Sequence, residues 1–223
     1  MIVKDEEDVL ERALSSIKDI ADEIIIVDTG STDMTKEIAA KFTDKIFDFE
    51  WCDDFSKARN YSFSKATQDY CMWLDADDVL LEADQKELMK LKETLSPETS
   101  VVMMRYNTGF DNDGKPTFTY YRERLLRRED QFYWEGFVHE VISPRGKMEY
   151  SEIAITHRKI KAGNPLRNIR MFKAKEKEGI LFSPREMFYY ARELYYHKYY
   201  DEAITQFKKF LNTGKGWREN NIS

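Results

Sequence analysis

Short apolar runs alternate with amphipathic stretches along the first 160 positions of the chain. The runs that predict strands are residues 24–27, 45–49, 70–74, 100–106 and 152–157. Helices are predicted over residues 8–21, 34–42 and 82–94, the first from apolar positions three and four apart. Strands alternating with helices are typical of a doubly wound α/β sheet. The β-branched run at 24–27 favours a parallel strand that is buried on both faces.

The middle of the chain predicts a β-hairpin. Residues 117–127 alternate between apolar and polar side chains, and Asp111-Asn112-Asp113-Gly114 is a strong turn signal before them. We therefore expect residues 117–127 to pair with the strand at 100–106.

The pattern changes at Asn164, after which only helices are expected. Pro165 stands where a helix begins, and a basic helix follows it up to Lys177. Amphipathic helices are predicted over 184–196 and 200–212, and this pair looks like a tetratricopeptide repeat of about 34 residues. Four small or aromatic residues carry the match: Ala191, Tyr195, Ala203 and Phe207.

Two regions follow from this pattern. Residues 1–160 are expected to form the α/β domain, and residues 161–223 a helical linker with a repeat. The chain opens on the end of a strand at Met1 and stops soon after an apparent new start at Trp217. We expect a fragment of a longer protein in which further repeats follow, because a single repeat buries its apolar face poorly.

Composition narrows the class of protein. The formal charge of −6, without a basic stripe interleaved with aromatic residues, argues against a nucleic-acid partner. Cys52 and Cys71 show no metal-binding spacing and are expected to be reduced thiols. There is no signal peptide and no apolar run of bilayer-spanning length, so a cytoplasmic location is expected, with a peripheral contact at the membrane left open.

Candidate chemistry begins at Asp75-Ala76-Asp77-Asp78, directly after the strand at 70–74. Ligands of open α/β sheets bind at the carboxyl ends of the strands. Alternation directs Asp75 and Asp77 to one side and Asp78 to the other. Two carboxylates without a neighbouring cation repel each other, and Mg²⁺ or Mn²⁺ would relieve that repulsion. The alternative is a solvated turn that leads into the helix at 82–94, with Asp78 near its N-terminus.

Asp28 and Arg59 are the next candidates. Asp28 ends the strand at 24–27, where a nucleotide would bind, and Gly30 allows the tight turn that follows. The alternative role for Asp28 is a turn or capping carboxylate. Arg59 lies on the early turns of a helix after residue 54, within reach of a phosphate or a base, or else paired with Asp53 or Asp54.

Five motifs in this order resemble those of family 2 glycosyltransferases of the GT-A fold, in particular a bacterial branch in which some members carry tetratricopeptide repeats after the catalytic domain. The motifs are Val3–Glu7, Val27–Asp33, Trp51–Asn60, Leu74–Asp77 and Gly136–Glu140. The resemblance covers roughly residues 1–160.

The resemblance implies an inverting transferase with a nucleotide-sugar donor, often a UDP-sugar, and with Mn²⁺ or Mg²⁺. By position, Asp28 recognises the base or ribose, and Asp5 and Glu7 lie beside the same pocket. Arg59 supports the base or diphosphate. The resemblance also implies that Asp75 contacts the ribose or the metal and that Asp77 binds the metal.

An inverting transferase also needs a carboxylate that accepts the proton of the acceptor. In the family this acid follows the metal motif, so Glu140 is the first candidate and Glu135 the second, the alternative being that both are solvated acids. Some relatives complete the metal site with a histidine. His157, which ends the last predicted strand, is the first candidate for that ligand, ahead of His139.

The acceptor is left open between a glycan, a lipid-linked molecule and a peptide. The sequence lacks the Gln-x-x-Arg-Trp motif of many processive relatives, which disfavours polysaccharide synthesis. A nucleotidyltransferase is disfavoured because the first loop is acidic rather than glycine-rich and basic. A catalytically inactive scaffold, whose repeat binds a protein partner, is the alternative from a different class.

Overall fold

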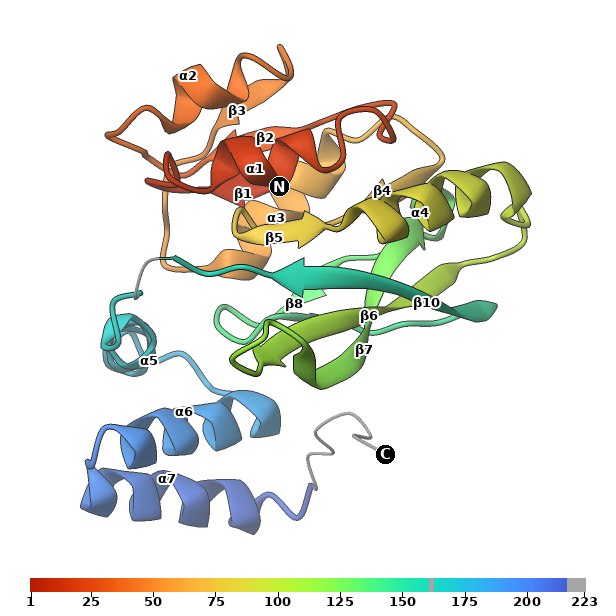
Figure 1. Cartoon of the computed structure of the whole chain (residues 1–223). Coiled ribbons are helices and arrows are strands. Elements are labelled where there is room, and N and C mark those ends of the chain that lie inside the picture. Colours follow the sequence, from red (N-terminus) through yellow and green to blue (C-terminus); the bar gives the residue numbers. More distant parts are fainter. Residues whose placement is uncertain (161–162, 216–223) are drawn as a thin grey trace. The chain divides into compact units, whose positions relative to one another are not determined.

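The computed structural model describes residues 1–160 and 163–215, which fall into two compact units. The first unit comprises residues 1–135 and 141–160, and the second comprises residues 136–140 and 163–215 (Figure 1). The repeat expected after Trp217 lies outside the described residues.

A small parallel sheet begins the first unit. Its strands are β1 (Ile2–Val3), β2 (Ile26–Asp28) and β3 (Ile46–Asp48), in the order β1-β2-β3. Helices α1 (Leu10–Ser15) and α2 (Thr35–Ala39) connect them. The parallel arrangement was expected, but α1 is shorter than the predicted 8–21, because residues 16–20 continue as turns with i→i+3 bonds such as Ile20 N to Ile17 O.

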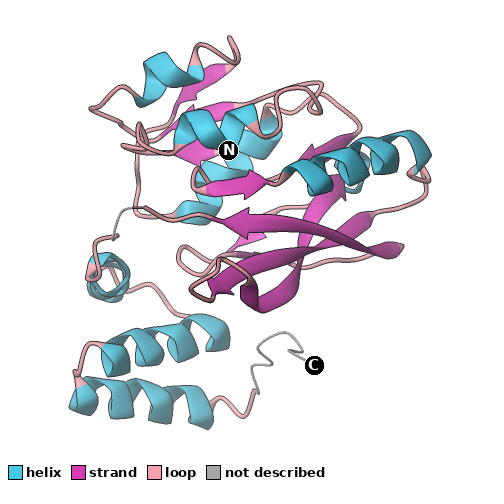
Figure 2. Ribbon diagram, in the orientation of Figure 1, coloured by secondary structure: helices cyan, strands magenta, loops and turns pink. Residues whose placement is uncertain are grey.

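The second sheet of this unit has five strands in the order β4-β7-β6-β10-β5. Figure 2 draws the strands in magenta. The strands are β4 (Tyr70–Met72), β5 (Asp78–Leu80), β6 (Val101–Phe110), β7 (Pro116–Arg127) and β10 (Met148–His157). The predicted hairpin is present as the antiparallel pair β6 and β7. Strand β10 lies between β6, to which it is parallel, and β5, to which it is antiparallel.

Strand β5 was not predicted: Asp78 was expected either to continue the strand at 70–74 or to stand in a turn near the start of the helix at 82–94. The residue instead begins a strand, and the register of β5 on β10 sets Asp78 opposite His157. The preceding strand is also shorter than predicted, because β4 ends at Met72. The linker that carries Asp75 and Asp77 therefore leads from one edge strand of the sheet to the other.

Helices and apolar side chains hold these strands. Helix α4 (Glu82–Thr94) has the predicted bounds and packs on β10. Helix α3 (Phe55–Ser64) is capped by Asp54, whose side chain accepts a hydrogen bond from the backbone N–H of Lys57. A core of eight buried residues joins the sheet to α4: Leu74, Leu80, Leu88, Val102, Met104, Tyr106, Ile153 and Ile155. A short turn η1 (Arg128–Asp130) and the paired strands β8 (Trp134–Glu135) and β9 (Val141–Ile142) complete the unit.

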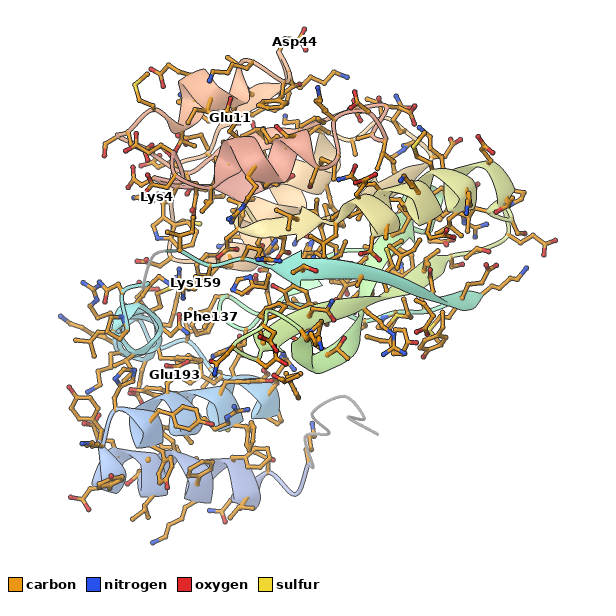
Figure 3. The ribbon with its side chains drawn as sticks, in the orientation of Figure 1. Lys4, Glu11, Asp44, Phe137, Lys159 and Glu193 are labelled. Atoms are coloured by element: carbon orange, nitrogen blue, oxygen red, sulfur yellow. The ribbon has the colours of Figure 1, made fainter. Side chains whose placement is uncertain are left out.

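The second unit is helical. It contains α5 (Arg167–Lys177), α6 (Pro184–Tyr196) and α7 (Tyr200–Asn212), close to the predicted bounds, and α6 packs against α5 and α7. A capping box of Ser183 and Glu186 starts α6. The unit also includes residues 136–140, because the ring of Phe137 lies 4.9 Å from that of Phe172 in α5. Phe137 and Glu193, both of this unit, are labelled in Figure 3.

In residues 1–160 and 163–215, the helices are all too short or too polar to cross a membrane.

Candidate functional site

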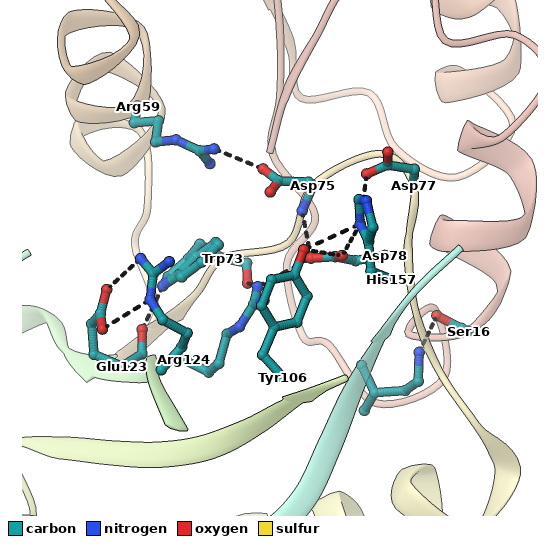
Figure 4. Close-up of polar contacts among 12 residues, drawn as sticks. Ser16, Arg59, Trp73, Asp75, Asp77, Asp78, Tyr106, Glu123, Arg124 and His157 are labelled. Carbon is teal, nitrogen blue, oxygen red and sulfur yellow. Dashed lines mark hydrogen bonds and ion pairs between the residues drawn. The ribbon is translucent and has the colours of Figure 1, made fainter. Parts of the chain in front are cut away.

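An acidic cluster with one histidine lies where β5 begins and β10 ends (Figure 4). Nδ1 of His157 is 3.5 Å from a carboxylate oxygen of Asp77 and 3.2 Å from one of Asp78. One ligand atom from each of these three residues lies within 4.8 Å of the other two. Carboxylate and imidazole groups at such spacing form a suitable donor set for a divalent cation.

Asp78 is completely buried and forms an ion pair with an equally buried arginine. Nη1 of Arg124 donates to Oδ2 of Asp78 at 3.2 Å and to the backbone oxygen of Trp73 at 3.1 Å. The guanidinium lies between two rings, 3.7 Å from the centroid of Trp73 and 4.3 Å from that of Tyr106. The ion pair and the two rings offset part of the cost of burying both charges, while within the described residues Nε and Nη2 of Arg124 have no hydrogen-bond partner.

Asp75 has a different partner from Asp77. Its Oδ1 accepts from Nη2 of Arg59 at 2.7 Å, and Arg59 lies over the ring of Trp134 at 4.7 Å. Burial would raise the pKa of Asp75, but the charges of Arg59, Arg124 and others outweigh it and lower the pKa to about 2. Asp75 is therefore ionised at neutral pH.

The surroundings raise the pKa of both Asp77 and His157, which disfavours the charged form of Asp77 and favours the charged form of His157. Burial raises the pKa of Asp77, and the charges of Asp75 and Asp78 raise it further, while His157 opposes them. The hydrogen bond to Asp78 raises the pKa of His157, with the neighbouring carboxylates adding to the effect. The cluster therefore has an excess of negative charge, which a cation would neutralise.

A second polar region lies at the end of β2. Asp28 is only 2% exposed, and its Oδ2 accepts from the backbone N–H of Gly30 at 3.1 Å and of Ser31 at 3.0 Å. Its Oδ1 is buried and has no hydrogen-bond partner within residues 1–160 and 163–215. A buried acceptor without a donor is costly, so a ligand that donates a hydrogen bond here would be stabilised.

Asp5 and Glu7 bridge the loop after β1 to the loop after β2. Oδ1 of Asp5, a residue with a φ of 54°, accepts from the backbone N–H of Thr32 at 2.7 Å. Oε2 of Glu7 accepts from the backbone N–H of Met34 at 3.0 Å. These contacts give both acids a role in holding the two loops beside Asp28.

The two candidate bases lie in different units. Glu135, in β8, is exposed, and the hydroxyl of Tyr133 donates to it. Glu140 is half-buried and belongs to the second unit. Within the described part of the first unit, Glu135 is not one of the residues that gather with Asp77, Asp78 and His157.

His139 belongs to the helical unit rather than to the acidic cluster. Its Nε2 lies 2.9 Å from Oε1 of Glu193 in α6, and its ring stacks on Tyr189 at 4.3 Å. The same Glu193 oxygen accepts from Asn168 at 2.9 Å. His139 is therefore a packed residue in this structure.

Three residues in or beside the acidic cluster were not predicted as site residues: Asp78 and its two partners, Arg124 and Tyr106. Asp78 adjoins the motif but was assigned to the opposite side of the strand, while Arg124 and Tyr106 lie on distant strands. The only local signal for Arg124 is a charged residue next to Leu125-Leu126 in a predicted strand. The ion pair itself depends on the sheet order, which local patterns do not reveal.

A cavity of about 450 Å³ also exists in the first unit, apart from most of these residues. Apolar side chains including Leu14, Ile17 and Leu88 line it. Arg59 borders the cavity, whereas Asp28, Asp77 and His157 do not. The cavity therefore does not contain the carboxylates and the histidine at the strand ends, although Arg59 borders it.

Comparison with known proteins identifies a family and several relatives of this chain. The family model described as Glycosyl transferase family 2 matches residues 1–146. The SPβ prophage-derived glycosyltransferase SunS of Bacillus subtilis is 26% identical, covering 98% of this chain and 54% of SunS. A TPR repeat-containing protein of Synechococcus elongatus is 48% identical over 81 residues, or 36% of this chain and 20% of that protein. The chain thus spans about half the length of SunS and less of the Synechococcus protein.

Solved structures share the fold at low sequence identity. Residues 1–349 of S. aureus TarS, in a complex with UDP-GlcNAc, superpose with a TM-score of 0.55 at 15% identity over 86% of this chain and 64% of that fragment. Glucosyl-3-phosphoglycerate synthase of Mycobacterium tuberculosis, in a complex with Mn²⁺ and UDP-glucose, gives 0.52 at 14% identity over 82% of this chain and 79% of that one. The predicted GT-A fold followed by helices is confirmed.

Proposed function

Because the chain belongs to glycosyl transferase family 2, we propose that it transfers a sugar, with inversion, from a UDP-sugar to an acceptor. The observation that carries the proposal is the meeting of Asp77 and His157, from distant parts of the chain, in one acidic cluster at the strand ends. The complexes of TarS with UDP-GlcNAc and of the mycobacterial synthase with UDP-glucose support this class of donor.

The donor set fits a hard divalent cation, Mn²⁺ or Mg²⁺. We assign Asp77 and His157 as ligands, with Asp75 as a further ligand or a contact to the ribose. When bound, the cation supplies positive charge that stabilises the departing diphosphate. The Mn²⁺ complex of the mycobacterial synthase supports this assignment.

The nucleotide is assigned to the region beside Asp28. The unpartnered Oδ1 of Asp28 suits an N–H group of the base, while Asp5 and Glu7 hold the surrounding loops. Arg59, whose guanidinium stays charged at all relevant pH values, is assigned to the base or diphosphate. In this role the guanidinium of Arg59 contacts both the carboxylate of Asp75 and the nucleotide-sugar donor.

The acceptor side is proposed more broadly. Glu140 is the first candidate for the group that takes the proton of the acceptor, and Glu135 is the second. A glycan, a lipid-linked molecule or a peptide is the acceptor, and the α6–α7 pair, a tetratricopeptide-like repeat, recruits it or a protein partner. The exposed thiol of Cys52 and the buried one of Cys71 are both unpaired, which suits the cytoplasm.

Thermal denaturation with nucleotides tests this function. UDP or a UDP-sugar together with Mn²⁺ is expected to raise the Tm, because a ligand that binds only the native state stabilises it by about 2.7 kcal/mol at a hundred times its Kd. UMP without a metal serves as the control. The absence of any shift with UDP-, GDP- or dTDP-sugars would contradict the proposal and favour the inactive scaffold.

Asp28→Asn tests the nucleotide assignment. The amide oxygen can still accept from Gly30 and Ser31, but the amide group then presents a donor where the carboxylate presented an acceptor. We expect UDP affinity, measured by calorimetry, to fall at least about tenfold, which is about 1.4 kcal/mol. Asp48→Asn is the matched control, because Asp48 pairs with Asp28 in register on β3 but has an exposed side chain. Equal affinities of the two variants would refute the assignment.

A further inference from the structure

We propose that Asp78 is not a ligand of the cation but a positioning residue that, held by Arg124 and Tyr106, turns His157 so that its Nε2 faces the cation. This inference rests on the proposed function and deepens it, because it assigns roles within the same cluster. It names Tyr106 and Arg124 as parts of the site that no local motif indicated.

The carboxylate of Asp78 already has its contacts filled. Its Oδ2 accepts from the backbone N–H of Asp75 and from Arg124, both at 3.2 Å. Its Oδ1 accepts from the hydroxyl of Tyr106 at 2.9 Å and lies 3.2 Å from Nδ1 of His157. With two contacts on each oxygen and no exposed surface, Asp78 has little capacity left to bind a cation directly.

The contacts of the His157 ring define its orientation. In the part of the chain that the structure describes, its polar contacts all run through Nδ1, to Asp77, Asp78 and Tyr106. In the neutral ring, a proton on Nδ1 that is donated to Asp78 leaves the lone pair on Nε2. A carboxylate that fixes the tautomer in this way is the usual partner of a metal-binding histidine.

Arg124 and Tyr106 keep this carboxylate in place. The guanidinium is completely buried and packs against the rings of Trp73 and Tyr106. The hydroxyl of Tyr106 meets both Asp78 and His157. Tyr106 therefore connects the fixed ion pair to the orientation of the histidine.

Tyr106→Phe separates the two roles of Asp78, because they predict opposite changes. If Asp78 positions His157, loss of the hydroxyl loosens the ring, and Mn²⁺ affinity is expected to fall about tenfold or more. If Asp78 binds the cation, loss of the hydroxyl frees Oδ1, and the affinity is unchanged or higher. Binding of Mn²⁺ alone is measured by electron paramagnetic resonance of the free ion.

Tyr120→Phe is the matched control, because the ring of Tyr120 lies 5.7 Å from that of Tyr106 and packs against the same apolar core. Its Mn²⁺ affinity is expected to match that of the parent protein. An unchanged or higher affinity of Tyr106→Phe overturns the inference and leaves the proposed function standing. A parent protein that binds no Mn²⁺ overturns both the inference and the metal assignment.

A second measurement needs no variant. The ¹⁵N chemical shifts of His157 in the parent protein, recorded at alkaline pH where the ring is neutral, report its tautomer. We expect a protonated Nδ1 and an unprotonated Nε2, with Mg²⁺ shifting the Nε2 resonance. A protonated Nε2, or a shift confined to Nδ1, would overturn the inference even if Tyr106→Phe did not fold.

Discussion

Asp77→Ala is expected to lower kcat/KM for sugar transfer by about 10²- to 10³-fold, the loss typical when one group that stabilises developing charge is removed. Asp77 is the least compensated carboxylate of the cluster, since Arg59 pairs with Asp75 and Arg124 with Asp78. Its charge is therefore the one that a cation can neutralise most favourably. The Mn²⁺-dependent rise in Tm with UDP is expected to disappear as well.

The fold of Asp77→Ala should remain intact, which separates this effect from unfolding. Because burial raises the pKa of Asp77 in the folded state, its ionised form opposes folding at neutral pH, and removing the carboxylate relieves that cost. Asp19→Asn, at an 82% exposed side chain, is the control and should retain full activity. Transfer within a factor of two of the parent rate would remove Asp77 from the proposed mechanism.

Local patterns were sufficient for the elements with strong periodicity. The helix at 82–94 has the predicted bounds, and the hairpin of β6 and β7 follows its turn signal. Asp28 does lie at the end of a buried parallel strand. These features depend on residues that are close in sequence, and there the amphipathic spacing and turn chemistry are decisive.

The acidic cluster depended on contacts that local patterns do not contain. Alternation predicts that Asp75 and Asp77 point to one side, with no Lys or Arg nearby in sequence, but Arg59 reaches Asp75 from α3. It also directed Asp78 away from the site, whereas the pairing of β5 with β10 sets Asp78 against His157. Alternation along one strand cannot reveal which strand lies beside it.

Arg124→Met is expected to lower the free energy of unfolding of the first unit by about 3–5 kcal/mol, because it leaves Asp78 as a buried charge without its partner. A typical domain has only about 5–15 kcal/mol of stability, so the loss is a large fraction of it. Urea denaturation followed by tryptophan fluorescence measures the change, since Trp73 lies against the guanidinium. A loss below about 1 kcal/mol would show that the pair contributes little to folding.

The double variant Arg124→Met with Asp78→Leu decides whether that loss comes from the unpaired charge. Replacing both members of a buried pair with apolar residues is often neutral or stabilising. We therefore expect the double variant to be more stable than Arg124→Met alone. Its affinity for Mn²⁺ should nevertheless stay low, because His157 has lost the carboxylate that orients it. A stable protein with a weakened cation site would show that the ion pair serves the site at least as much as the fold.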